Sequence, residues 1–212
     1  MTTILWFKRD LRLVDHPAAA LAGQGGAGVL PLFVVEPALW AEPDMAGRHW
    51  DFVAECLSDL RAATARRGAP LVVRVGDAVE VLDDLARRHG VTRILSHEET
   101  GNAWTYARDR RVADWARARG ITWKEVPQSG VVRRLAGRDG WAAQRDRFLK
   151  RDFAATDAVT FDARGEAPGA IPTAHDLGIA PDPCAARQAG GRAAALALLG
   201  GFLTERGRTY RA

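Results

Sequence analysis

The chain has 212 residues, of which 47% are hydrophobic and 26% charged, a composition typical of a globular domain with or without an appendage. No apolar stretch approaches the roughly 20 residues of a membrane span, and the N-terminus lacks a secretory signal pattern. Two cysteines, Cys56 and Cys184, are too few for a disulfide framework. We therefore expect a cytoplasmic protein with no membrane partner. The net charge of +4 permits contact with nucleic acid or phosphate but does not require it.

Strand-like and helix-like segments alternate over the first 126 residues. The strands are expected at 3–7, 29–35, 70–75, 93–96 and 121–126. Trp50 to Leu60 has helical spacing, Asp77 is a good N-cap for the next helix, and Gly90 and Gly120 stand where two helices should end. This alternation predicts βαβ units, and therefore a three-layer, Rossmann-like α/β fold with an open parallel five-stranded sheet.

A glycine cluster between the first helix and the second strand has the spacing of a dinucleotide fingerprint, at Gly23, Gly25 and Gly28. That fingerprint must follow a strand and open a helix. Here a helix precedes the cluster and a strand follows it, so we interpret it as a helix-to-strand turn. The chain also lacks a P-loop lysine motif.

After residue 126 the alternation stops. Residues 131–160 form a basic extension, for which a solvated helix surface is favoured over a phosphate-contacting face. Residues 161–191 are rich in Pro and Gly and predict a connector. Residues 192–212 carry an amphipathic helix whose expected inward side chains are Ala195, Leu196, Leu199, Phe202 and Leu203. A connector leading to an apolar helix suggests a partner.

The residues give no sign of a nucleophile, a general base or a metal site. The five histidines are scattered and lack partners at zinc spacing: His16, His49, His89, His97 and His175. We therefore predict no catalytic residues and no metal.

Charged residues follow three of the expected strands. Lys8, Arg9 and Asp10 follow the first strand, Glu36 follows the second, and residues 97–102 follow the fourth. Ligands of open parallel sheets bind beyond the carboxyl ends of strands where the strand order reverses. If the first and fourth strands are neighbours, these charges converge on one crevice. The alternative is a lattice of ion pairs that pins the first loop, including Arg12 and Asp15.

The stretch "LWFKRDLRLVDHPAAALA" resembles the N-terminal signature of the DNA photolyase/cryptochrome family. The resemblance continues through "PLFVVEPALWAEPDMAGRHWDFVAECLSDL", "YARDRRVADWARARGI" and "LLGGFLTERGRTYRA". It implies an α/β antenna domain with its core at 1–130, its extension at 131–160, an interdomain connector at 161–191, and at 192–212 the first helix leading to an FAD-binding helical domain absent from this sequence. The implied parent is a photolyase that uses FAD and light to repair cyclobutane pyrimidine dimers in damaged DNA. The fragment alone would not be catalytic.

The resemblance also bears on the antenna pigment, which in this family is a folate or a flavin-like molecule. Folate-type bacterial members carry His where Pro43 stands here, and an acidic residue where we place Asn102. A flavin-like pigment (deazaflavin, FMN or a lumazine) is therefore favoured over folate, in the crevice of the α/β domain. The residues expected to hold it are Arg9, Asp10, Val34, Val35, Glu36, Arg48 or His49, Glu98, Glu99 and Asn102.

Two other functions remain open. The first alternative is the antenna domain of a cryptochrome-type photoreceptor, and the second is a stand-alone nucleotide-binding α/β domain. We also expect the apolar C-terminal helix to be exposed or to pair with a second copy, which makes a dimer possible.

Overall fold

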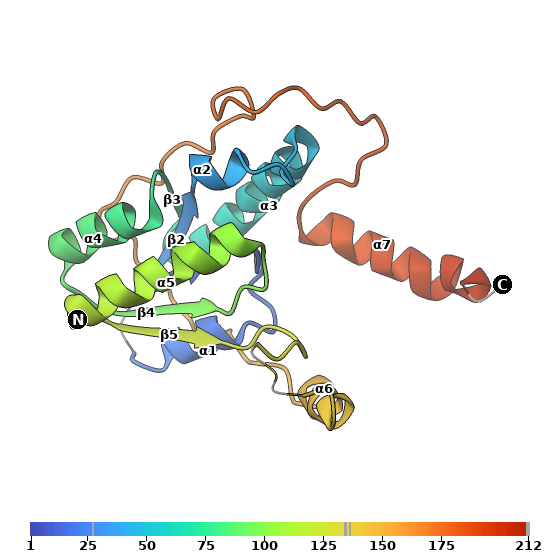
Figure 1. Cartoon of the computed structure of the whole chain (residues 1–212), viewed down its shortest axis with the longest axis horizontal. Helices are drawn as coiled ribbons and strands as arrows, with labels where there is room; N and C mark the ends of the chain where they lie inside the picture. Colours follow the sequence, from blue (N-terminus) through green and yellow to red (C-terminus); the bar gives the residue numbers. More distant parts are fainter. Residues whose placement is uncertain (27, 134, 136, 211–212) are drawn as a thin grey trace.

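The structure, a computed structural model, describes residues 1–26, 28–133, 135 and 137–210. Its centre is a parallel five-stranded sheet in the order β3-β2-β1-β4-β5 (Figure 1). The strands are β1 (Thr2–Phe7), β2 (Val29–Val35), β3 (Val72–Val75), β4 (Val91–His97) and β5 (Thr122–Val126). The predicted open parallel sheet is confirmed, and β1 and β4 are neighbours at the point where the strand order reverses.

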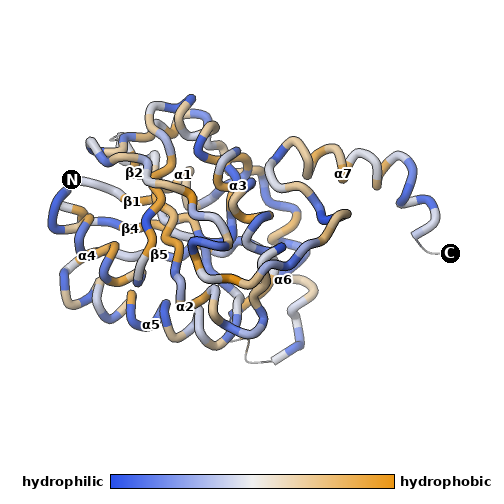
Figure 2. The backbone as a smooth tube through the Cα atoms, turned by 90° about the horizontal axis from the view of Figure 1, so that it is seen from above, coloured by the Kyte–Doolittle hydropathy of each residue, from blue (hydrophilic) through white to orange (hydrophobic). Residues whose placement is uncertain are grey.

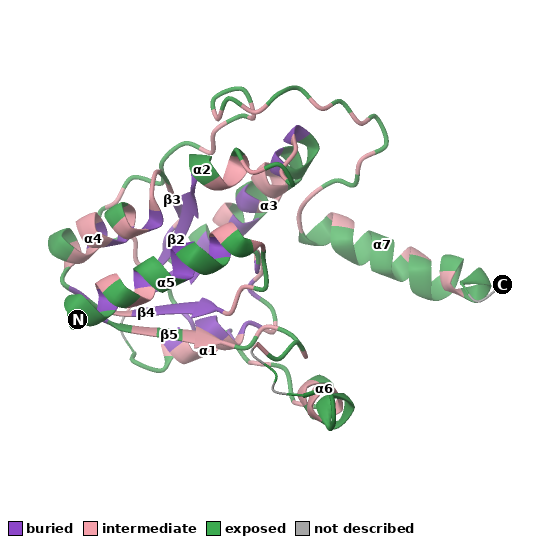
Figure 3. Cartoon of the chain, in the orientation of Figure 1, coloured by how far each residue is buried: buried purple, intermediate pink, exposed green. Residues whose placement is uncertain are grey.

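Helices cover both faces of the sheet and make two separate cores (Figure 3). One face packs on α1 (Pro17–Gly23) and α3 (Gly47–Ala65), and the other on α4 (Ala78–His89) and α5 (Ala103–Ala118). Successive residues of β1 point to opposite faces, so Leu5 and Phe7 enter the first core while Ile4 and Trp6 enter the second. The central strand is therefore buried on both sides, which its apolar sequence requires.

The helix ends follow the predicted capping residues. Asp77 accepts hydrogen bonds from the backbone N–H groups of Val79 and Glu80, and Gly90 ends α4 with a φ of 58°. This left-handed conformation favours glycine. Between Gly23, where α1 ends, and Val29, where β2 begins, lies the glycine cluster, and its interpretation as a helix-to-strand turn is confirmed.

The segment predicted as a connector lies against the domain over much of its length. Phe161 is buried and forms a parallel bridge with Val29 beside β2, and the Val73 N–H donates to the Pro168 carbonyl at 2.8 Å. Figure 1 shows this segment, in orange, passing along the domain before the chain reaches α7 (Arg192–Thr204), and Figure 2 shows α7 leading away from the domain. Its apolar residues explain the packing, because five of them pack against the core on the α1 and α3 side of the sheet: Ala163, Ile171, Ala174, Leu177 and Ile179.

Four short elements lie outside the three layers: α2 (Pro37–Trp40), α6 (Trp141–Leu149), α7 (Arg192–Thr204) and η1 (Arg206–Thr209). The basic α6 contains no buried residue. Helix α7 projects from the domain (Figure 1), and it too has no buried residue. Leu199 is 52% exposed and Leu203 is 69% exposed, so the expectation that this apolar helix is exposed is confirmed, and its expected inward face packs on neither core of the described residues. Within the described residues no helix is long and apolar enough to cross a membrane.

Candidate ligand cavity

A cavity of about 700 Å³ opens beyond the carboxyl ends of β1 and β2. We call it the apolar cavity, because most of its wall is aromatic or aliphatic. The β-strands contribute Trp6, Phe7, Phe33 and Val34. The segment from α2 into α3 contributes five more apolar side chains: Leu39, Trp40, Met45, Phe52 and Val53. Trp40 is held by an edge-on contact with buried Trp50, with ring centroids 4.8 Å apart.

The polar base of the apolar cavity is organised by Arg108 from α5. This side chain is almost fully buried and pairs with three carboxylates: Glu36, Glu99 and Asp109. Its guanidinium also lies 4.9 Å from the centre of the Trp6 ring, a cation–π contact. Arg9 completes the group by pairing with Glu99 at 2.9 Å. A buried guanidinium needs such partners, because an uncompensated charge in the interior is costly.

Glu36 is the titratable group of this base. Its Oε1 accepts a hydrogen bond from the Ala78 N–H at the start of α4, at 3.3 Å. Burial raises the pKa of Glu36 to about 7, although the neighbouring Arg108 guanidinium acts in the opposite direction. The base of the cavity therefore changes charge near neutral pH.

A second, smaller crevice of about 200 Å³ lies beyond the ends of β1, β4 and β5. Its cation Lys8 lies between Asp109, at 3.3 Å, and Glu125, at 3.1 Å. Arg133 also pairs with Glu125, at 2.6 Å. These cations are compensated by carboxylates, so the crevice has the character of an ion-pair lattice.

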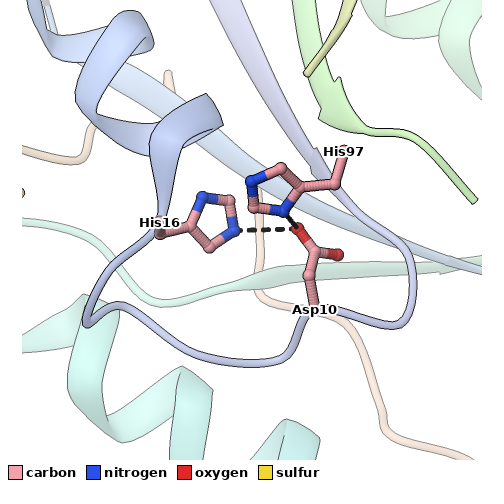
Figure 4. Close-up of side chains that lie close together, drawn as sticks. All are labelled: Asp10, His16 and His97. Carbon is pink, nitrogen blue, oxygen red and sulfur yellow. Dashed lines mark hydrogen bonds and ion pairs between the residues drawn. The ribbon is translucent and has the colours of Figure 1, made fainter. Parts of the chain in front are cut away.

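Asp10 lies between the two crevices and is clamped by two histidines (Figure 4). Its Oδ2 is 2.8 Å from His16 Nε2 and 2.7 Å from His97 Nδ1, and its Oδ1 accepts from the Lys8 N–H at 2.8 Å. All three side chains are fully buried. The pKa of Asp10 lies well below its usual value, because the contacts with His16 and His97 outweigh the opposing effect of burial.

Two histidines and a carboxylate are a possible metal ligand set, but the backbone argues against that use. The Ala19 N–H donates to His16 Nδ1 at 2.9 Å, and the Ala18 N–H donates to His97 Nε2 at 3.4 Å. Each neutral ring therefore carries its proton on the nitrogen that faces Asp10, which leaves no lone pair there for a metal. The cluster is better described as a carboxylate that is hydrogen-bonded to His97 and lies within ion-pair distance of His16.

The sequence contained no spacing that pairs these histidines. His16 is the N-cap residue of α1 and His97 ends β4. They meet only because β1 and β4 are adjacent, which brings the loop after β1 close to the carboxyl end of β4. The clue was that each follows a strand that lies at the reversal of strand order.

The structure places the predicted site residues in several different surroundings. Arg9, Asp10, Val34, Glu36, Glu99 and His49 line the apolar cavity, and Glu98 lines the smaller crevice. Val35 is buried in the core on the α1 and α3 side of the sheet. Arg48 pairs with Asp182 at 2.6 Å. Asn102 caps α5 and donates to Asp44 at 3.2 Å, so it acts through the loop that carries Asp44.

Arg12 and Asp15 were expected to belong to the ion pairs that hold the first loop. Arg12 donates to the Asp15 carbonyl at 3.0 Å, and the Asp15 side chain accepts from the Ala154 N–H at 2.9 Å. Both residues hold the loop between β1 and α1. Cavity residues that the sequence did not suggest are Trp40, Phe52 and Arg108, together with Gly191, Arg192 and Ala195 from the start of α7.

Curated relatives match parts of this chain. A cryptochrome DASH of Arabidopsis thaliana (chloroplastic/mitochondrial) is 35% identical over 104 residues, which are 46% of this chain and 18% of that protein. A deoxyribodipyrimidine photo-lyase of Salmonella typhimurium is 38% identical over 99 residues, 44% of this chain and 21% of that protein. This chain therefore aligns with only a part of each relative.

Solved structures share the fold. A bacterial class III photolyase from Agrobacterium tumefaciens superposes with a TM-score of 0.74 at 20% identity, covering 95% of this chain and 44% of that one. An archaeal photolyase from Sulfolobus tokodaii, described with two FAD molecules, superposes with a TM-score of 0.64 at 21% identity, covering 76% of this chain and 38% of that one.

The family model for DNA photolyase matches residues 3–136, which include all five strands except Thr2 and most of the residues that line the apolar cavity. This chain therefore belongs to the DNA photolyase family.

Proposed function

We propose that this chain is the light-harvesting N-terminal domain of a deoxyribodipyrimidine photolyase, and that the apolar cavity holds a flavin-like pigment. The observation that carries the proposal is the cavity itself: about 700 Å³, walled by Trp40, Phe33 and Phe52 above a buried polar base. This volume and mixture of walls are typical of a site for a small organic ligand.

The residues of the cavity would divide the work of binding. The aromatic and aliphatic wall would cover the ring system and exclude water. At the base, the carboxylate of Glu36 accepts hydrogen bonds and the guanidinium of Arg108 donates them, so both kinds of polar group on a pigment could be satisfied. When bound, the pigment would absorb blue or near-UV light. The solved Sulfolobus tokodaii structure, whose second FAD is described as implying a novel light-harvesting cofactor, supports a flavin over a folate.

The repair activity belongs to the proposed parent protein. In it, FAD would drive the repair of cyclobutane pyrimidine dimers in DNA, and α7 would pack against the FAD domain. Two observations support this: the solved Agrobacterium tumefaciens photolyase is more than twice the length covered by this chain, and α7 exposes apolar side chains along its length. The chain itself would supply the pigment site and no catalytic residue.

A cryptochrome-type photoreceptor is the second candidate, favoured by the likeness to cryptochrome DASH. A repair assay on the parent protein separates the two. Ultraviolet-damaged DNA would be mixed with the parent and exposed to blue light. Loss of dimers is expected for a photolyase, and their persistence would favour the photoreceptor.

The pigment site is tested on the 212-residue chain. FMN, a deazaflavin, a lumazine, a folate and ATP would be added in turn while absorbance and melting temperature are recorded. A flavin-like ligand at about 100 times its Kd should stabilise the chain by about 2.7 kcal/mol. Trp40→Ala should weaken binding, while Trp115→Phe on α5 is the matched control. Stabilisation by ATP alone would instead favour a nucleotide-binding domain, and no response to any ligand would contradict both.

A further inference from the structure

The start of α7 forms part of the wall of the apolar cavity. Gly191, Arg192 and Ala195 line it together with Phe52 and Cys56 of α3. Gly191, Arg192 and Ala195 lie more than 50 positions beyond the part of the chain that matches the family model, which ends at residue 136. The cavity is thus closed by a segment that both the family match and the sequence-predicted core at 1–130 leave out.

Helix α3 fixes the position of this first turn. Glu55 accepts from the Gly190 N–H at 2.6 Å and pairs with Arg187. The Gly191 N–H donates to the sulfur of Cys56 at 3.2 Å, and the Arg192 N–H donates to Asp59 at 3.0 Å. Because these backbone donors already have partners, a ligand would not bind to them. What α7 offers the cavity is the side chain of Arg192.

The cations that line the apolar cavity are not equivalent. Lys8, Arg9 and Arg108 each pair with at least one carboxylate. Arg12 donates only to a backbone carbonyl, and the Arg192 side chain has no ion pair among the described residues. On α3, Glu55 pairs with Arg187, and Asp59 accepts a hydrogen bond from the Arg192 N–H and not from its guanidinium. Arg12 and Arg192 therefore carry charge that a ligand could neutralise.

An aromatic-walled cavity with uncompensated guanidinium groups fits a ligand that combines a flat ring with an anionic group. We propose that Arg192, assisted by Arg12, is the specificity-determining residue that selects a phosphorylated pigment over its uncharged counterpart. This rests on the proposed function, because it concerns the same cavity. It also makes ligand affinity depend on the docking of α7, since Arg192 reaches the cavity only while Glu55, Cys56 and Asp59 hold the first turn in place.

FMN and riboflavin provide the test, because they share the ring and differ in the phosphate. The dissociation constant of each would be measured on the 212-residue chain by fluorescence titration. We expect FMN to bind about 5-fold more tightly than riboflavin at low salt, as one partly exposed ion pair allows, and less so at 0.5 M NaCl. Arg192→Gln should remove most of this preference, chiefly by weakening the binding of FMN. Arg208→Gln, on η1 beyond the cavity, is the matched control and should keep the preference.

Three results would overturn the assignment: equal binding of FMN and riboflavin by the unaltered chain, a preference that survives Arg192→Gln, or the same loss with Arg208→Gln. Failure of both ligands to bind would instead contradict the proposed pigment site. A variant that severs the docking, Gly190→Ala, gives a second measurement. It should reduce the FMN preference although it leaves Arg192 in the sequence.

Discussion

At the scale of single residues, the buried charges differ in what holds them. Asp10 is surrounded by proton donors that come from three places, the imidazoles of His16 and His97 and the Lys8 N–H. Glu36 has one strong partner, Arg108, and a helix N-terminus. Folding therefore lowers the pKa of Asp10 and raises that of Glu36. The contribution of Asp10 to folding stability should therefore fall as the pH is lowered, whereas that of Glu36 should fall as the pH is raised.

Replacing Asp10 with Asn should destabilise the fold by about 3 kcal/mol at pH 7, because two buried N–H groups lose an ionised acceptor. The ionised carboxylate stabilises the fold above its unfolded-state pKa of 3.8, and this contribution is lost as pH falls through the lowered folded-state pKa. The difference between Asp10→Asn and the unaltered chain should thus shrink below about pH 4. Urea unfolding at several pH values measures it. Asp157→Asn, at an almost fully exposed position, should change stability by less than about 0.5 kcal/mol.

Glu36→Gln should flatten the pH dependence on the neutral side. The folded pKa of about 7 exceeds the unfolded value of 4.5, so the folded state binds more protons between these values. The stability that Glu36 contributes is present below pH 4.5 and is lost as pH rises through 7, by about 3 kcal/mol at most. Unfolding of the unaltered chain and of Glu36→Gln would be compared at pH 5.5 and pH 8. A difference between the two proteins that stays constant over this range would show that Glu36 is ionised throughout.

At the scale of elements, we call the segment 161–191 the strap, because it contacts the domain at several places between β2 and α3. Glu166 joins it to β3 and α4 through Arg74 at 2.5 Å and His89 at 2.5 Å. Gly190 lets it approach α3 closely, since a Cβ there would lie 2.5 Å from the Phe52 carbonyl oxygen. The strap positions the start of α7 against the cavity. Gly190 is needed there because only a residue without a Cβ can approach the α3 backbone so closely.

Gly190→Ala and Gly200→Ala form a matched pair of substitutions. The first places a methyl group against the backbone of α3 and should destabilise the chain by about 1–3 kcal/mol. The second lies in α7 with open space around it, and should raise helix stability by about 0.5–1 kcal/mol. Circular dichroism and thermal unfolding of the two variants report both effects. Equal changes in the melting temperature of the two variants would mean that the strap does not pack closely against α3 at Gly190.

At the scale of the whole molecule, α7 is the part least suited to water. From Ala193 to Thr204 it contains no charged residue, and a helix that is apolar all round is normally buried. Phe202 contacts Tyr210 with ring centroids 5.7 Å apart, which covers only one end. In the proposed parent protein the FAD domain would cover the rest. In the 212-residue chain, we propose that a second copy does so.

The chain alone should therefore self-associate as its concentration rises. Light scattering coupled to size-exclusion chromatography would measure the mass. Leu199→Lys with Leu203→Lys should return it to that of a monomer, because both side chains are exposed on α7. Leu149→Lys, at an exposed position on α6, serves as the control and should leave the association unchanged. A monomer at all concentrations would contradict pairing through α7.

The sequence by itself determined the five parallel strands, the helices between them and the caps at Asp77 and Gly90, because these depend on local propensity and on the period of apolar residues. It also identified the family and most of the charged residues near the cavity. Tertiary structure alone decided that His16 and His97 meet at Asp10, that Arg108 joins three carboxylates, and that Arg192 closes the cavity. The strand order and the path of the strap bring these residues together from distant positions in the chain. Neither can be recognised from the spacing of residues in the sequence. The sequence likewise predicts an apolar face on α7 that needs a partner, and the structure confirms that this face is exposed, because burial depends on what packs against a helix and neither core of the described residues reaches it.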